Sequence, residues 1–206
     1  VHNEAEVERL TELGMKFIDH EKLHTLKNSK LLIRAHGEPP STYDIARKNN
    51  LQIIEGTCPI VRRLQKKVHT SFSIANEEEE MVIIFGKAEH PEVIGLKGQT
   101  DNLAVVIKSP EEAETIPLKK KISLFSQTTM SESEYEIVAE ILKKRVAKYG
   151  GELSISNSIC GHVSRRKPGL EKFAAENDVI IFVGGKNSSN AKSLYKICKL
   201  VNLNTY

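Results

Sequence analysis

Two cysteines are the residues most able to do chemistry, because each follows a run of strand-forming residues. Cys58 comes shortly after Leu51–Ile54, and Cys160 comes shortly after Leu153–Ile155. Pro59 suits the first position of a helix, where its missing N–H needs no partner, so Cys58 is predicted at or just before a helix N-terminus. The partial positive charge of that helix end favours a thiolate, the form that attacks electrophiles or binds metals.

The elements that must position these thiols alternate between strands and helices. Strands are predicted at Lys16–Ile18, Leu31–Arg34, Leu51–Ile54, Met81–Phe85, Leu103–Ile107, Ile122–Phe125, Leu153–Ile155 and Val179–Val183. Two of these segments, Met81–Phe85 and Val179–Val183, have the continuous apolar pattern of buried strands. Helices are predicted at Glu4–Leu13, at Thr42–Asn49 after a capping box at Ser41–Asp44, from Pro59 to about Ser73, from Ser109, from Ser131 to Gly150, through Leu170 and Phe173, and at Ala191–Val201.

The pattern of cysteine, helix, buried strand and polar loop occurs twice. It runs from Cys58 to Glu92 and again from Cys160 to Asn190. Alternating strands and helices predict parallel sheets, in which ligands bind beyond the carboxyl ends of the strands. His36 is predicted at the same edge, so we expect small α/β units that face one shared site.

Composition and charge exclude several classes of protein. The chain has 206 residues, of which 39% are apolar, and Lys and Arg exceed Asp and Glu by only 30 to 27. This balance does not indicate a nucleic-acid partner. No apolar run is long enough to span a membrane, so we expect a cytoplasmic protein. Three cysteines without close spacing argue against a disulfide framework.

Short motifs distributed along the chain resemble those of the LytB/IspH family. In order along the chain they are Val1-His2-Asn3, Ala35-His36-Gly37, Thr57-Cys58-Pro59, His90-Pro91-Glu92-Val93, Gln127-Thr128-Thr129, Ile159-Cys160 and Lys186-Asn187-Ser188-Ser189-Asn190. The resemblance implies a pseudo-threefold α/β protein whose three small parallel-sheet domains surround a central [4Fe–4S] cluster. The expected domains are 1–56, 57–157 and 158–206, the first and third incomplete.

The resemblance also implies an activity. The family removes the hydroxyl of 4-hydroxy-3-methylbut-2-enyl diphosphate reductively, and it forms isopentenyl and dimethylallyl diphosphates in the last step of the methylerythritol phosphate pathway. The expected partners are therefore this small allylic diphosphate and an electron donor such as ferredoxin or flavodoxin. Iron would act as Lewis acid and electron conduit, while the protein supplies position and protons.

Roles follow from the resemblance residue by residue. Cys58 and Cys160 resemble two of the three cluster ligands, Glu92 resembles the proton source, and Thr128 resembles the residue that hydrogen-bonds the substrate hydroxyl and helps to pass a proton. The positions that match those holding the substrate diphosphate are His2, His36, His90, Ser188 and Asn190, with Ser189 beside them. Hydroxyl, amide and imidazole donors beside a helix N-terminus suit a diphosphate.

Two further expectations concern individual side chains. Pro91 biases His90 toward an extended backbone, and strand-like alternation would then turn His90 and Glu92 to one side. Cys198 falls in the middle of a predicted helix, on its apolar side, so we expect it in the core.

The chain also departs from the family pattern. After Cys160 it reads Gly161-His162-Val163-Ser164-Arg165-Arg166-Lys167, where family members usually have a Thr and an Arg-Gln pair. The segment with the first cysteine and the family's C-terminal Ser-containing region are missing from the 206 residues. We therefore expect a fragment that is inactive by itself and holds a cluster weakly.

Two alternatives to a reductase stay open at the level of sequence. One is a phosphate-ester-binding module without redox chemistry. The other is a structural zinc protein that uses Cys58, Cys160 and a histidine such as His162. Zinc sites normally contain close cysteine pairs, and the sequence has none.

Overall fold

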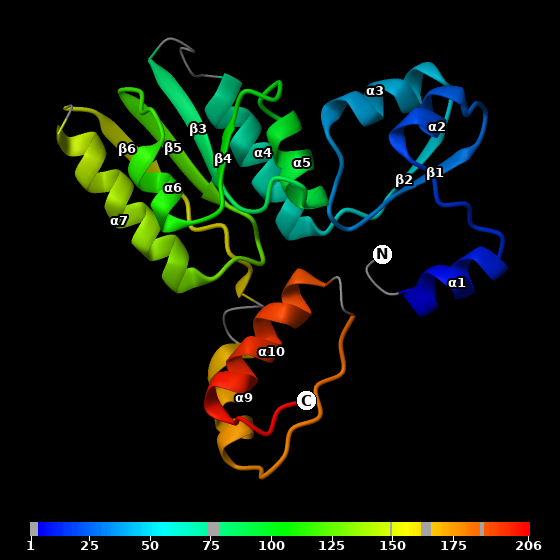
Figure 1. Ribbon diagram of the computed structural model, residues 1–206. Helices are drawn as coiled ribbons and strands as arrows, with labels where there is room; N and C mark the ends of the chain where they lie inside the picture. The colour runs from blue at the N-terminus through cyan, green and yellow to red at the C-terminus, as the bar shows by residue number, and fades with distance from the viewer. Residues whose placement is uncertain (1–3, 74–78, 149, 162–165, 186–187) are drawn as a thin grey trace. The chain divides into compact units, whose positions relative to one another are not determined.

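The computed structural model describes residues 4–73, 79–148, 150–161, 166–185 and 188–206. The chain divides into two compact units, Ile18–Ser158 and Ile159–Tyr206 together with the residues up to Phe17. The larger unit contains a two-stranded and a four-stranded sheet (Figure 1), and the strands pair in parallel throughout both. The prediction of an α/β fold with parallel sheets is confirmed, whereas the three domain boundaries and the pseudo-threefold arrangement stay predictions.

The two-stranded sheet joins β1 (Lys30–Ile33) to β2 (Gln52–Glu55). Helices α2 (His20–Thr25) and α3 (Pro40–Lys48) share a small hydrophobic core, in which Leu23 is buried. Because the strands are parallel, the loops that follow them meet at one edge. The backbone N–H of Cys58 donates to the carbonyl of Ala35 across this edge at 3.0 Å.

The four-stranded sheet has the order β4-β3-β5-β6. Its strands are β3 (Glu80–Phe85), β4 (Val105–Ile107), β5 (Lys121–Ser126) and β6 (Glu152–Ile155). Its helices are α4 (Pro59–Ser73), α5 (Pro91–Gly98), α6 (Pro110–Thr115) and α7 (Glu132–Lys148). The apolar run Met81–Phe85 lies in the middle of the sheet, where both faces are covered, so the prediction of a buried strand is confirmed there.

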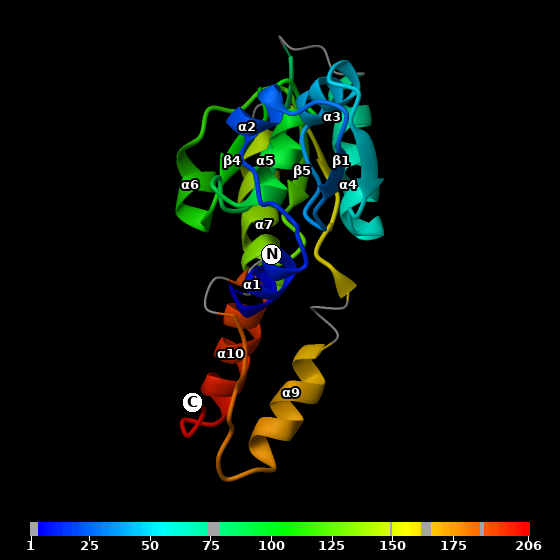
Figure 2. The ribbon, with the colours of Figure 1, turned by 90° about the vertical axis from the view of Figure 1, so that its right-hand side faces the viewer.

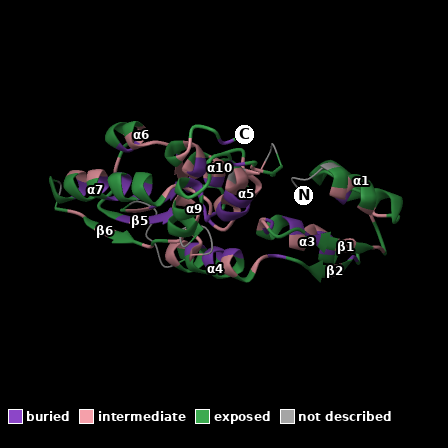
Figure 3. Cartoon of the chain, turned by 90° about the horizontal axis from the view of Figure 1, so that it is seen from below, coloured by how far each residue is buried: buried purple, intermediate pink, exposed green. Residues whose placement is uncertain are grey.

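Helices cover both faces of this sheet. On one face, Leu64 and Val68 of α4 and Val93 of α5 form a buried cluster with the strands. On the other face, the Tyr135 ring of α7 lies 6.2 Å from the Phe85 ring of β3. Figure 2 and Figure 3 show α4 and α7 on opposite sides of β5. This packing fixes the carboxyl ends of β3 and β5, which carry the predicted site residues.

The local predictions were wrong at two places before β2. Residues 16–18 form no strand. Helix α3 begins at Pro40 after Pro39, whose side chain makes no capping hydrogen bond, so the predicted capping box at Ser41 is absent. A proline at the first helical position sets φ in advance and needs no partner for a missing N–H, so it starts the helix earlier than Ser41 would.

The smaller unit contains α1 (Glu4–Glu12), α9 (Arg166–Ala175) and α10 (Ser189–Val201). Cys198 is buried with Ala174 and Ile180, which confirms its assignment to the core. The prediction of a buried strand at Val179–Val183 was wrong, because within the described ranges this segment has one parallel bridge, from Ile180 to Thr205. Val183 is 91% exposed. Among the described residues, no helix is long and apolar enough to cross a membrane.

Candidate functional site

Cys58 occupies the turn between β2 and α4, as its sequence context predicts. It directly precedes Pro59, the first residue of α4, and its carbonyl accepts from the N–H of Arg62 at 2.9 Å. The thiol is half-buried and forms no disulfide. A half-buried thiol at a helix N-terminus is suited to act as a thiolate ligand.

The carboxylate of Glu55, three residues before Cys58, fixes this turn. Glu55 accepts from the N–H of Thr57 at 3.0 Å and from the hydroxyl of Tyr43 at 3.0 Å. Burial alone would raise the pKa of the Glu55 carboxyl, but hydrogen bonds from Thr57 and Tyr43 and the charge of Arg62 lower it overall. Glu55 is therefore held as a carboxylate that orders the backbone before Cys58. No motif predicted this role, although Glu55 is the last residue of strand β2.

Two histidines that are distant in the sequence lie against each other. The rings of His36, after β1, and His90, after β3, are 5.3 Å apart and nearly perpendicular at 83°. His90 is the N-cap of α5, and its Nδ1 accepts from the N–H of Glu92 at 3.2 Å. In a neutral His90 ring the proton is then on Nε2. The pair thus joins the ends of strands from two different sheets.

Glu92 and Thr128 form a deeply buried polar pair at this edge. The two carboxylate oxygens of Glu92 accept from the backbone N–H and from the hydroxyl of Thr128, each at 2.7 Å. Glu92 is only 2% exposed and Thr128 only 5%. Burial raises the pKa of the Glu92 carboxyl, and the hydrogen bonds from Thr128 offset only part of that rise. Glu92 is therefore a carboxyl group whose protonated form is favoured more than that of an exposed glutamate.

The expected extended backbone of His90 is confirmed, with φ −73° and ψ 133°, whereas the expected strand-like alternation with Glu92 was wrong. Pro91 starts helix α5, so Glu92 lies in its first turn and strand-like alternation does not apply. Proline is favoured at that position for the same reason as Pro59 in α4. The two side chains are related through the His90 cap on the Glu92 N–H.

Gln127, which precedes Thr128, ties two loops together. Its Nε2 donates to the hydroxyl of Thr129 at 2.9 Å, and its Oε1 accepts from the N–H of Lys87 at 3.1 Å. A Cβ on Gly86 would lie 3.0 Å from the Cβ of Gln127, so the loop after β3 approaches this side chain closely. The loops after β3 and β5 therefore hold each other in place.

The smaller unit carries the other predicted residues. Ser188 caps α10, where its Oγ accepts from the N–H of Ala191 at 3.2 Å. The Oδ1 of Asn190 is buried and has no hydrogen-bond partner within the described part of the chain. Cys160 is half-buried and free of disulfides, and Ser189 is the first residue of α10. His2 and His162 lie outside the described residues.

The structure therefore assembles one part of the predicted site and leaves the other part a prediction. Within the larger unit, Cys58, His36, His90, Glu92 and Thr128 all follow the carboxyl ends of parallel strands. Cys160, Ser188 and Asn190 belong to the smaller unit. Within the described residues, no three His, Cys, Asp or Glu side chains are grouped so that they could hold a metal ion.

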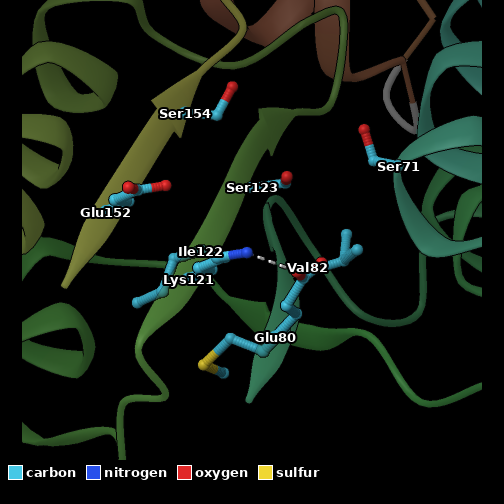
Figure 4. Close-up of a pocket in the computed structure, with 9 residues that line it drawn as sticks. Ser71, Glu80, Val82, Lys121, Ile122, Ser123, Glu152 and Ser154 are labelled. Carbon is cyan, nitrogen blue, oxygen red and sulfur yellow. Dashed lines mark hydrogen bonds and ion pairs between the residues drawn. The ribbon is translucent and has the colours of Figure 1, made fainter. Parts of the chain in front are cut away.

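A pocket of about 140 Å³ lies at the opposite end of the four-stranded sheet, among the first residues of its strands. Figure 4 shows Ser71, Ser123 and Ser154 around it, with Lys121 near Glu80. Its lining contains none of the predicted site residues. The chemistry at the carboxyl edge is therefore separate from this pocket.

Comparison with known proteins shows the family to which the chain belongs. A family model described as LytB protein matches residues 1–206. The chain belongs to the LytB family. Its curated relatives include the 4-hydroxy-3-methylbut-2-enyl diphosphate reductase of Bacteroides thetaiotaomicron, which is 46% identical over 206 residues, 100% of this chain and 71% of the relative. The enzyme of the same name from Pelodictyon phaeoclathratiforme is 42% identical, over 100% of this chain and 72% of the relative.

Solved structures agree with this LytB assignment. One is the structure of (E)-4-hydroxy-3-methyl-but-2-enyl diphosphate reductase, described as the terminal enzyme of the non-mevalonate pathway. It has a TM-score of 0.69 and 32% identity, over 100% of this chain and 71% of that chain. The corresponding reductase from Plasmodium falciparum has a TM-score of 0.82 and 29% identity, over 100% of this chain and 63% of that chain. The resemblance inferred from short motifs is thus confirmed.

Proposed function

We propose that this protein is a 4-hydroxy-3-methylbut-2-enyl diphosphate reductase. In this reaction the allylic C–O bond of the substrate breaks, and the hydroxyl leaves as water after it takes one proton. Two electrons and a second proton then complete isopentenyl or dimethylallyl diphosphate. The observation that carries the proposal is the buried Glu92–Thr128 pair, which supplies a carboxyl group and a hydroxyl in direct contact at the strand ends.

The family motifs assign the residues that would hold the diphosphate. His36 and His90 lie 5.3 Å apart, close enough to contact one phosphate group together. Ser188 caps helix α10, and Asn190 lies in the first turn of the same helix. The positive end of a helix and its N–H groups favour an anion. Ser189 and His2 are assigned to the same role by the family motif alone.

Glu92 and Thr128 are assigned to the proton. The protonated form of Glu92 is favoured by burial, and the negative charge of a bound diphosphate would favour it further. The Thr128 hydroxyl touches the carboxylate at 2.7 Å, so it can receive a proton from Glu92 and donate one to an oxygen beyond it. This arrangement delivers a proton to a leaving hydroxyl without admitting bulk water.

The chemistry of the available thiols fits an iron–sulfur cluster. Cys58 and Cys160 are both half-buried and uncrosslinked, and we assign them as thiolate ligands of a [4Fe–4S] cluster. When bound, the cluster would supply electrons from a donor such as ferredoxin or flavodoxin, together with an iron that binds oxygen. Cys198 is excluded from this set, since it is buried in the core of the smaller unit.

A turnover assay with the reconstituted full-length protein tests the proposal. Reduced viologen would supply electrons, and the two alkenyl diphosphate products would be measured by chromatography. Substrate binding with no product would favour the non-redox phosphate-ester-binding module. Stoichiometric zinc held by the cysteines, with no visible iron–sulfur absorbance after anaerobic reconstitution, would favour the zinc protein.

A further inference from the structure

We propose that Gln65 is a positioning residue that holds His36 opposite His90 for the substrate diphosphate. This inference rests on the proposed function. Gln65 is on α4, seven residues after Cys58 and so on the same helix face. Its side chain is buried, with 7% of the residue exposed, and its Nε2 donates to the carbonyl of Glu38 at 3.3 Å.

The loop that carries His36 is shaped around this amide. Gly37 has a positive φ of +72°, and a Cβ there would lie 2.5 Å from Gln65 Nε2. Any larger residue would be strained and would collide with the amide. The backbone on both sides of Gly37 is thus fixed against one side chain, and His36 is the residue directly before it.

The same amide also contacts the helix that begins at His90. A Cβ on Gly95 of α5 would lie 3.0 Å from Gln65 Nε2 and 3.6 Å from the backbone carbonyl of Gly37. Two glycines, one in each segment, therefore let the amide lie between the His36 loop and α5. Since His90 caps α5, the position of Gln65 sets the separation of the two imidazole rings.

The Glu38 side chain does not substitute for this contact. Its carboxylate pairs with Arg34 at 3.1 Å and with His20 at 3.4 Å, whereas Gln65 binds its backbone carbonyl. Loss of the amide donor would leave that carbonyl buried without its partner and would free the loop to shift. The effect should fall on diphosphate binding, because both histidines are assigned to the phosphates of the substrate.

The test compares Gln65→Met with Gln99→Met in the full-length protein. Methionine keeps the length of the side chain and removes the amide. Gln99 is a matched control because its Nε2 also donates to a backbone carbonyl, that of Gly95, at the far end of α5. The probe is inorganic pyrophosphate, with affinity measured by calorimetry. We expect about 10-fold weaker binding for Gln65→Met and a change of less than about twofold for Gln99→Met.

Steady-state kinetics separate positioning from general stability. Loss of binding shared by substrate and transition state raises KM and leaves kcat unchanged, so Gln65→Met should raise KM about 10-fold with kcat within about twofold. A merely structural role would lower the amount of folded enzyme, and hence the apparent kcat, without changing KM.

Gly95→Ala provides a second variant in case Gln65→Met does not fold. Alanine favours the helix over glycine, so the fold should be retained while the added methyl group displaces the amide. Weaker pyrophosphate binding in Gly95→Ala would support the proposal. Binding within about twofold of wild type in every variant that folds would overturn it. Failure of wild-type protein to bind pyrophosphate would overturn the proposed function as well, so the two failures are distinguishable.

Discussion

Both carboxylate oxygens of Glu92 accept hydrogen bonds from a single residue, Thr128, each at 2.7 Å. One bond comes from the backbone and fixes the orientation of the carboxylate. The other comes from the hydroxyl and can carry a proton. The same contact therefore joins the end of β5 to the start of α5 and connects an acid to a hydroxyl.

Replacing Glu92 by Gln should impair catalysis and leave the fold intact. The Gln oxygen can accept from the Thr128 N–H, and its amide can donate to the Thr128 hydroxyl, which then reverses its role. The acid is lost, so turnover should fall by about 10²-fold or more, while cluster absorbance and pyrophosphate affinity stay near wild type. Glu140→Gln, at an exposed residue of α7, is the control. A near-normal rate in Glu92→Gln would refute the catalytic role.

The stability of the protein should depend on pH through Glu92. Because burial raises the pKa of this carboxyl in the folded state, the folded protein binds more protons than the unfolded chain above the ordinary glutamate range. The contribution of Glu92 to stability is then fully present at low pH and is lost as pH rises through the raised pKa. Thermal unfolding from pH 4 to 8 should show wild type losing stability relative to Glu92→Gln. Parallel curves for the two proteins would contradict the raised pKa.

Substitutions at Thr128 should distinguish the contributions of its two hydrogen bonds to the stability of the protein. Thr128→Val keeps the backbone donor and removes the hydroxyl, so one buried carboxylate oxygen loses its partner at a cost of about 1–3 kcal/mol in the free energy of unfolding. Thr128→Ser keeps both donors and should lose much less. Urea denaturation of the two variants measures the difference. Equal losses would mean that the threonine methyl group, rather than the hydroxyl, stabilises this site.

The cysteines should differ in their effects on iron. Cys58→Ser should abolish most of the visible iron–sulfur absorbance after anaerobic reconstitution, because it removes a thiolate at the turn before α4. Cys198→Ser should keep the absorbance and lower only the unfolding temperature, since Cys198 is 1% exposed and packs in the core. Retention of a full cluster by Cys58→Ser would overturn its assignment as a ligand.

Strands buried on both faces were the most predictable part of this protein. Met81–Phe85 has the continuous apolar pattern of a strand buried on both faces, Ile122–Phe125 was predicted as a strand, and both are strands of the four-stranded sheet. Val179–Val183 has the same pattern, yet its exposure depends on which other segments pair with it, and local sequence does not contain that information. The helix at Pro91–Gly98 was missed because Pro91 was taken only as a restraint on His90.

The position of the candidate residues at strand ends was predictable, and their contacts were not. His36, His90, Glu92 and Thr128 carried recognisable motifs, and all four follow strand ends in the larger unit. The bond between Glu92 and Thr128 links residues 36 positions apart, so no local periodicity could reveal it. Gln65 is part of no sequence motif. Its place between the His36 loop and α5 is seen only in the structure, where Gly37 and Gly95 pack against its amide.

The two-stranded sheet has a kinetic consequence. His36 and Cys58 depend on β1 and β2, which are four residues each and share a small core, whereas Glu92 and Thr128 depend on a sheet covered on both faces. Isolated strand pairs are marginally stable, so local opening should release the first two residues together while the acid and its hydroxyl stay in place. In hydrogen exchange the amides of Leu31 and Ile54 should therefore lose protection long before those of Ile83 and Leu124. Local opening should then expose His36 and Cys58 while Glu92 and Thr128 stay protected.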